Sequence, residues 1–352
     1  MRYFVLSFMF VGIMGISVAQ TELTPNDPIP DTIPITAENI QDLRPVMQID
    51  FADYPDILSG WFVMSPDGHY VAVRAGLNRM MIWDDNDLIA DFTLQDTTNN
   101  IVDAVFAPDD NMLILIDDSG QVLFYFIELD LQSIFAPALN NHVVQSVWFN
   151  RDGTIWIEAL TLPNNDYTVF SINPVLEITQ HTYVPATDPN ALVRIGRILP
   201  PYVVTSSPEG EVKLWQLETG DVLASADVGD MPAVFGQISP NAQFLVWRDP
   251  MSEAVNLLNF ETGDNQPIAD LNGAYFQAFF VSDDASLILA VDEDFEPRVV
   301  AWIVATGERV DLGEFRACSR VPDMIRMSHD FTTLVIGCDT GLDIWRIAPE
   351  EE

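Results

Sequence analysis

The sequence predicts an all-β fold in which seven repeats of about 40–45 residues each form a small antiparallel sheet. One large residue per repeat follows a run of alternating apolar residues, and successive ones lie 42, 45, 45, 43, 44 and 43 residues apart. Strand-only repeats of this period are typical of propeller blades, in which each four-stranded sheet buries its face against the next. A seven-bladed β-propeller is therefore expected. The seven anchor residues are Trp83, Tyr125, Phe170, Trp215, Leu258, Trp302 and Trp345.

A turn marker precedes each anchor by about 15–20 residues and supports the same repeat. Pro, Asp, Asn and Gly gather there, and these residues preset the geometry of tight turns between strands. Apolar runs flank the turns, so each marker is expected to join the first strand of a blade to the second. The markers are residues 64–68, 107–110, 150–153, 239–242, 282–284 and 328–330, with 199–201 substituting in the fourth repeat.

The repeats resemble those of the WD40 family over residues 37–347, and Trp83-Asp84 is a literal copy of the dipeptide that names it. The opening segment, with Leu43, Met47 and Ile49, is similar to the entry segment of secreted bacterial WD40 repeat proteins. The resemblance implies a β-propeller that acts as a rigid scaffold for protein partners.

Residues 1–19 have the pattern of a secretory signal peptide. Arg2 supplies the positive start, residues 3–16 are apolar, and Ser17-Val18-Ala19 is a small-residue cleavage site, so cleavage is expected near Ala19. Export to the periplasm or the extracellular space follows, with an uncleaved membrane anchor as the alternative. No later apolar stretch is long enough to span a membrane, so none is expected in the mature chain.

The rest of the chain divides into three parts. Residues 20–35 form a Pro-rich leader that should be flexible and extended, because proline removes a hydrogen-bond donor and little here can be buried. Residues 36–348 form the propeller, opening with a short helix over 37–43 and a strand over 46–51. That strand should be the outer strand of the Trp345 blade, which otherwise lacks one and would leave the ring unclosed. Residues 349–352 are an acidic tail.

The charge is strongly acidic, with 53 Asp and Glu against 15 Lys and Arg and a net charge of −38. Nucleic acids and anionic lipids are recognised first through Lys and Arg, so neither is an expected partner. A hydrophobic content of 48% excludes general disorder. The acidic surface is expected to keep an exported protein soluble.

The two cysteines, Cys318 and Cys338, both fall in the last repeat. A simple hairpin register brings them within a few residues of each other. In an exported protein this favours a disulfide, with two buried thiols as the alternative.

The remaining residues show no catalytic, metal or nucleotide motif, so the protein is expected to be neither an enzyme nor dependent on a cofactor. The four histidines have no ligand spacing, and no nucleophile elbow or phosphate-binding glycine loop is present. The acidic runs 84–87 and 292–296 offer several oxygens but do not fit a calcium loop, which leaves Ca²⁺ a disfavoured ligand. The histidines are His69, His142, His181 and His329.

Arginines are scarce and therefore informative. Arg194 and Arg197 lie in the expected inner strand of the fourth repeat, and Arg316, Arg320 and Arg326 begin the seventh. Pairing with surrounding carboxylates is the simplest role. The alternative is an anion site at the mouth of the propeller channel, where the guanidinium fork would suit an anionic group.

Two functions remain. The favoured one is a non-catalytic exported scaffold whose loop-bearing face binds a protein or peptide; the alternative is a propeller hydrolase or carbohydrate-binding protein with its site at the channel mouth. Convergence of carboxylates and histidines from several blades would favour the alternative. The loops joining second to third strands are the expected interaction face. They carry the candidate binding residues Tyr167, Met251, Asp292, Asp294 and Phe295.

Overall fold

The computed structural model describes residues 33–347 apart from short internal gaps. Residues 1–32 and 348–352 lie outside the described residues, and with them the predicted signal peptide, most of the leader and the acidic tail. The gaps are 58–60, 86, 95–98, 136–138, 140–141, 150–152, 162–165, 183–193, 200–201, 208, 217–218, 230–233, 250, 273–275, 293–297 and 315–323.

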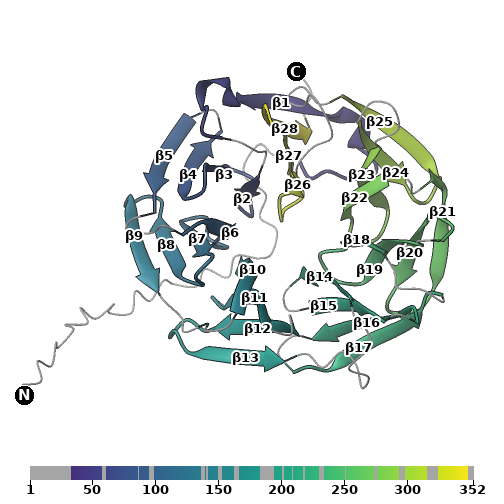
Figure 1. Cartoon of the computed structure of the whole chain (residues 1–352). Helices are drawn as coiled ribbons and strands as arrows, with labels where there is room; N and C mark the ends of the chain where they lie inside the picture. The colour runs from purple at the N-terminus through teal and green to yellow at the C-terminus, as the bar shows by residue number, and fades with distance from the viewer. Residues whose placement is uncertain are drawn as a thin grey trace, which may run out of the picture.

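Seven four-stranded antiparallel sheets form a closed ring, which confirms the predicted all-β, seven-bladed propeller (Figure 1). In each blade the first strand lies nearest the axis and the fourth lies at the periphery. Because the four strands of a blade alternate in direction, the first–second and third–fourth turns lie at one end of the blade. The second–third turn and the connections to the neighbouring blades lie at the other end. We call the side with the first–second and third–fourth turns the hairpin face. The side with the second–third turns and the connections between blades is the loop face.

The first four blades use sixteen consecutive strands. Blade 1 is β2 (Phe62–Met64), β3 (Tyr70–Ala75), β4 (Arg79–Asp84) and β5 (Asp87–Thr93). Blade 2 is β6 (Ile101–Phe106), β7 (Met112–Asp117), β8 (Val122–Phe126) and β9 (Leu131–Phe135). Blade 3 is β10 (His142–Phe149), β11 (Ile155–Thr161), β12 (Asp166–Ile172) and β13 (Ile178–Thr182). Blade 4 is β14 (Arg194–Leu199), β15 (Tyr202–Ser206), β16 (Glu211–Gln216) and β17 (Val222–Asp227).

The last three blades complete the ring. Blade 5 is β18 (Val234–Ile238), β19 (Phe244–Arg248), β20 (Ala254–Asn259) and β21 (Asn265–Asn272). Blade 6 is β22 (Phe276–Val281), β23 (Leu287–Asp292), β24 (Arg298–Ile303) and β25 (Glu308–Glu314). Blade 7 combines β26 (Met324–Met327), β27 (Thr333–Gly337) and β28 (Gly341–Ile347) with β1 (Leu43–Asp50).

All seven anchor residues lie on the third strand of a blade, as the repeat spacing requires. Six are buried, at 0–5% exposure, and fill the spaces between neighbouring sheets. The seventh, Trp215, is half-buried, and its indole N–H donates to the Thr205 hydroxyl at 2.8 Å. The anchors therefore pack blade against blade, which explains why one large residue recurs in each repeat.

The first–second turns fall at the predicted turn markers, and four of them share one hydrogen-bond pattern. A serine hydroxyl donates to the Asp or Asn two residues later and accepts the backbone N–H five residues later. The pattern closes each hairpin with hydrogen bonds from within its own turn. The four serines are Ser65, Ser239, Ser282 and Ser328.

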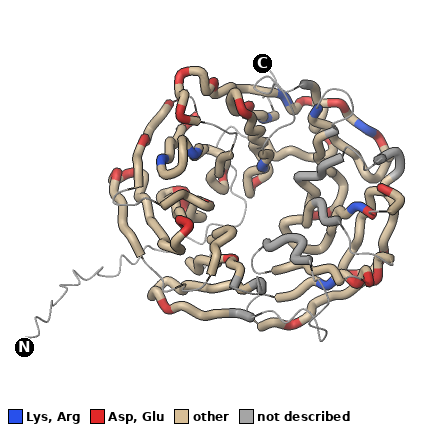
Figure 2. Tube along the Cα trace, in the orientation of Figure 1, with Lys and Arg blue, Asp and Glu red and all other residues tan. Residues whose placement is uncertain are grey.

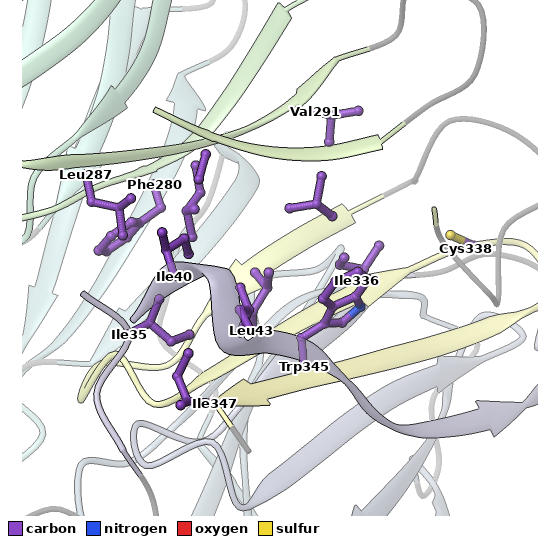
Figure 3. Close-up of a cluster of buried hydrophobic side chains, with 14 residues drawn as sticks. Ile35, Ile40, Leu43, Phe280, Leu287, Val291, Ile336, Cys338, Trp345 and Ile347 are labelled. Atoms are coloured by element: carbon purple, nitrogen blue, oxygen red, sulfur yellow. The ribbon is translucent and has the colours of Figure 1, made fainter. Parts of the chain in front are cut away.

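The N-terminal strand closes the ring. β1 pairs antiparallel with β28, with Leu43 opposite Ile347 and Asp50 opposite Gly341, which confirms the predicted outer strand of blade 7. Its lead-in buries Ile35 and Ile40 in a cluster with side chains of blades 6 and 7, including Phe280 and Trp345 (Figure 3). Closure therefore rests on apolar packing as well as on a strand ladder.

The predicted helix over 37–43 is wrong. Only a single 3-10 turn, η1 (Ile40–Asp42), precedes the strand, and β1 already begins at Leu43. The Asn39 side chain accepts the Thr36 N–H and donates to the Pro34 carbonyl, which favours a compact turn over a longer helix. A second 3-10 turn, η2 (Phe51–Asp53), follows β1.

Cys338 is fully buried directly after β27. Cys318 lies outside the described residues, so the disulfide between them stays a prediction.

Candidate functional site

Three of the five predicted binding residues, Tyr167, Met251 and Asp292, lie at the loop-face end of a blade, and of these only Met251 has a described side chain. It is 76% exposed on the β19–β20 turn. Tyr167 lies near the start of β12 and Asp292 ends β23, whereas Asp294 and Phe295 are outside the described residues.

Asp249 holds the turn that presents Met251. Its carboxylate accepts the Met251 N–H at 2.8 Å and the Ser252 hydroxyl at 2.5 Å, and these bonds lower the pKa of Asp249. Its carbonyl accepts the Glu253 N–H at 2.9 Å. Met251 is therefore held in solvent on an ordered turn, where a large apolar side chain gains nothing for the fold.

Leu77 presents a second exposed apolar side chain on the same face. It is 64% exposed on the β3–β4 turn, where sequence reasoning had not singled it out. Backbone hydrogen bonds on both sides fix the turn, from Gly76 N–H to the Asp56 carbonyl and from Ile101 N–H to the Leu77 carbonyl, both at 2.7 Å. Blades 1 and 5 thus each project one apolar side chain from a hydrogen-bonded turn.

A polar cluster lies on the first and second strands close to the axis. Asp103 on β6 accepts the Val147 N–H of β10 at 2.9 Å, which joins blade 2 to blade 3. Glu158 on β11 accepts the Ser146 hydroxyl at 2.7 Å. Two carboxylates from adjacent blades therefore interact near the axis, together with Arg326 on β26 of blade 7.

Burial perturbs the pKa of each charged group in this cluster. It raises the pKa of Asp103 to about 6, although two backbone N–H groups and Arg326 act in the opposite direction, and it raises the pKa of Glu158. It also lowers the pKa of Arg326, which Asp103 partly offsets. The Arg326 side chain is exposed to solvent, although the atoms packed around its guanidinium desolvate it enough to lower its pKa.

Arg74 on β3 extends the cluster into blade 1. Its guanidinium donates to the Ile101 carbonyl at 2.8 Å and lies over the Trp61 ring, 5.1 Å from the ring centroid. Burial lowers its pKa and Asp103 raises it. Arg194 and Arg197 are the two arginines predicted to line the channel mouth. They lie on β14, where Arg194 is opposite Ser206 and Arg197 is opposite Val204, and their side chains are outside the described part of the structure.

A second group of titratable residues joins blades 7 and 1 on the hairpin face. The His69 Nε2 lies 2.9 Å from an Asp84 carboxylate oxygen, and Arg346 reaches Asp85 at 3.2 Å and the Gly68 carbonyl at 3.2 Å. His69, Asp84 and Asp85 stand close enough to share a metal ion. The Arg346 guanidinium already balances the charge of Asp85, so we interpret the group as a junction between blades.

Sequence reasoning missed Asp103 and Glu158 because their partners are distant in the chain. One signal was present: each places a carboxylate inside a strand that is otherwise apolar. A buried charge in such a strand needs partners from elsewhere, and the partners come from other blades.

Comparison with known proteins supports the fold. No protein-family model matches the chain, and no curated protein matches its sequence. No helix in the described residues is long and apolar enough to cross a membrane. Among solved structures, a chain of the crystal structure of a mitotic checkpoint complex matches with a TM-score of 0.61 and 13% sequence identity, over 87% of this chain and 92% of that one. At this identity the similarity shows a shared seven-bladed β-propeller architecture.

Proposed function

We propose that the protein is an exported, non-catalytic scaffold that binds a protein or peptide on its loop face. The observation that carries the proposal is the pair of hydrogen-bonded turns that hold Leu77 and Met251 in solvent, at 64% and 76% exposure. Apolar side chains on ordered turns are typical of binding surfaces, because their ordering is already complete before the partner arrives. The similar propeller chain in a mitotic checkpoint complex supports a role in protein assembly.

Export is part of the proposal and rests on the sequence. Residues 1–19 have a secretory pattern, and the many acidic positions, marked along the trace of several blades in Figure 2, suit a protein that must stay soluble. N-terminal sequencing of the chain from each cell fraction tests this part. A secreted chain beginning at Gln20 is expected, and a membrane fraction that retains Met1 would indicate the uncleaved anchor.

Capture experiments test the scaffold. The tagged full chain and a Leu77→Ser/Met251→Ser variant are each exposed to native culture fluid and periplasmic extract. We expect at least one protein to be retained by the wild type and lost by the variant, with unchanged thermal unfolding. Identical capture by both chains would contradict binding on the loop face. A Val46→Ser variant, changed at an exposed apolar residue on β1, is the matched control.

A second candidate function is favoured by the axial cluster. Two carboxylates with raised pKa values and an accessible arginine resemble the groups that bind or hydrolyse a sugar or lactone. The test is binding and turnover of a glycan and lactone panel by the wild type, Asp103→Asn and Glu158→Gln. Turnover that Glu158→Gln abolishes would favour this function over the scaffold.

A further inference from the structure

The exposed apolar side chains gather on one part of the periphery. Among the described residues, fifteen large hydrophobic side chains are exposed, and ten of them lie on the outer strands of blades 1–4 or in the turns that lead into those strands. The outer strands β5, β9, β13 and β17 follow one another around the ring (Figure 1). The ten are Leu88, Ile89, Leu129, Leu131, Ile134, Val175, Leu176, Ile178, Val222 and Leu223.

The same part of the periphery carries only one sign of charge. We define the outer rim as the described residues 84–85, 87–93, 126–135, 172–182, 216 and 219–227; it contains nine Asp and Glu and no Lys or Arg. Figure 2 shows acidic but no basic positions along β5 and β9. The outer strands of blades 6 and 7, by contrast, contain Arg309 and Arg44. Arg79 and Arg346 reach in to pair with Asp91 and Asp85, and most other rim carboxylates face solvent.

The outer rim also offers backbone edges. β5, β9, β13 and β17 are each the last strand of a sheet, so one edge of each has no neighbouring strand within its blade. An exposed edge strand can pair with an extended segment of another protein, whose alternate side chains then meet the flanking surface. Exposed aliphatic residues beside such an edge favour apolar side chains in that segment.

Charge decides among the candidate occupants. A second copy of this chain, also at −38, would be repelled, as would nucleic acid or an anionic membrane. We propose that the outer rim binds an extended protein segment in which Lys or Arg alternates with aliphatic side chains. This inference rests on the proposed scaffold function and adds a second surface and the chemistry of its partner.

The probe is a synthetic peptide of alternating lysine and leucine, titrated against the full chain by calorimetry. A Leu129→Ser/Val175→Ser variant removes two rim side chains that are 69% and 74% exposed, both in turns, so folding should be unaffected. We expect binding to weaken by about tenfold or more, because two aliphatic contacts are lost. The Leu77→Ser/Met251→Ser variant is the matched control and should bind as the wild type does.

Charge is tested separately. Glu128→Lys, in the rim turn of blade 2, should weaken binding of the peptide, whereas Glu308→Lys, at the start of the outer strand β25 of blade 6, should change it little. A lysine–serine peptide should bind far more weakly than the lysine–leucine peptide, and added salt should weaken both. Equal binding of the two peptides, or equal loss in the loop-face control, would overturn the proposal.

The remaining outcomes separate this inference from the scaffold function. A wild-type dimer in solution that Leu129→Ser/Val175→Ser converts to a monomer would assign the rim to a second copy and overturn the proposal. Native proteins captured through Leu77 and Met251, with no peptide binding at the rim, would contradict the rim while supporting the scaffold. Peptide binding at the rim, with native capture unaffected by Leu77→Ser/Met251→Ser, would support the rim and contradict the loop face.

Discussion

At the scale of the residue, four first–second turns repeat the same serine hydrogen bonds, and the equivalent turn of blade 2 lacks them. Ser65, Ser239, Ser282 and Ser328 each bridge their turn, but blade 2 has Ala107 at the equivalent place. Its Asp110 adopts a left-handed backbone with φ 59° and leaves one buried carboxylate oxygen without a partner. The pKa of Asp110 is raised to about 8, mainly because the carboxyl group is buried and also because the negative charges of Asp67, Asp109 and Asp330 lie nearby.

Asp110→Asn should therefore stabilise the protein at neutral and alkaline pH. A folded-state pKa above the ordinary value means that the carboxyl's ionisation opposes folding, so wild-type stability falls as pH rises from about 4 to about 8. Asparagine tolerates the left-handed backbone, and its amide can still donate toward Asp67. We expect a gain of about 2 kcal/mol at pH 8 and little change at pH 4. Urea unfolding at both pH values measures it.

Exposed Asp227 supplies the control for that experiment. Asp227→Asn should leave the free energy of unfolding nearly unchanged at either pH, since a solvated carboxylate interacts weakly with the fold. A loss of stability in Asp110→Asn at pH 8 would show that the like charges at these turns do not repel as described.

At the scale of the element, the sequence predicted the strands of the blades correctly, but it predicted a helix over 37–43 that is not formed and did not identify the axial polar cluster. The repeat period places Trp83 and Trp345 on third strands because one large side chain per blade must fill the gap to the next sheet. The turn over 36–42 was mispredicted because Asn39 bonds its neighbours, which residue preferences do not reveal. Asp103, Glu158 and Arg326 come together only because the ring closes, so no local pattern could place them.

Closure should be sensitive to a single residue in the lead-in to β1. Ile40 is fully buried among side chains of blades 6 and 7. Ile40→Ala should lower the free energy of unfolding by about 3 kcal/mol through lost burial and the cavity left behind, and Ile40→Val by about 1 kcal/mol. Chemical denaturation measures both, with Leu77→Ala as the exposed control. An Ile40→Ala effect no larger than that control would mean that this segment does not hold the ring closed.

The predicted disulfide can be tested on the same blade. If Cys318 and Cys338 are joined, the intact mass of the exported chain should rise by two hydrogen masses on reduction. Cys318→Ser should then cost about 3 kcal/mol of stability, as expected for closing a loop of this length. Titration of two free thiols in the unfolded, unreduced chain would contradict the pairing.

At the scale of the whole molecule, the ring must hold a large net charge in a compact shape. Only 15 Lys and Arg oppose 53 Asp and Glu, and the ion pairs that Arg79, Arg298 and Arg346 form offset only a few of the carboxylates. Mutual repulsion across the ring therefore opposes folding, and the packing between blades must exceed it. The same field would draw a basic partner toward the outer rim and speed association more than it slows dissociation.

Salt should accordingly stabilise the isolated protein while it weakens binding of a basic partner. Raising sodium chloride from about 10 to about 300 mM shortens the screening length several-fold, so repulsion among the exposed carboxylates falls. We expect the melting temperature to rise by about 2–4 °C, corresponding to about 1–2 kcal/mol for a chain of this size. Calcium chloride at matched ionic strength separates screening from site binding. A much larger rise with calcium would indicate that an acidic cluster binds the ion, whereas no rise with either salt would contradict the repulsion on which this prediction depends.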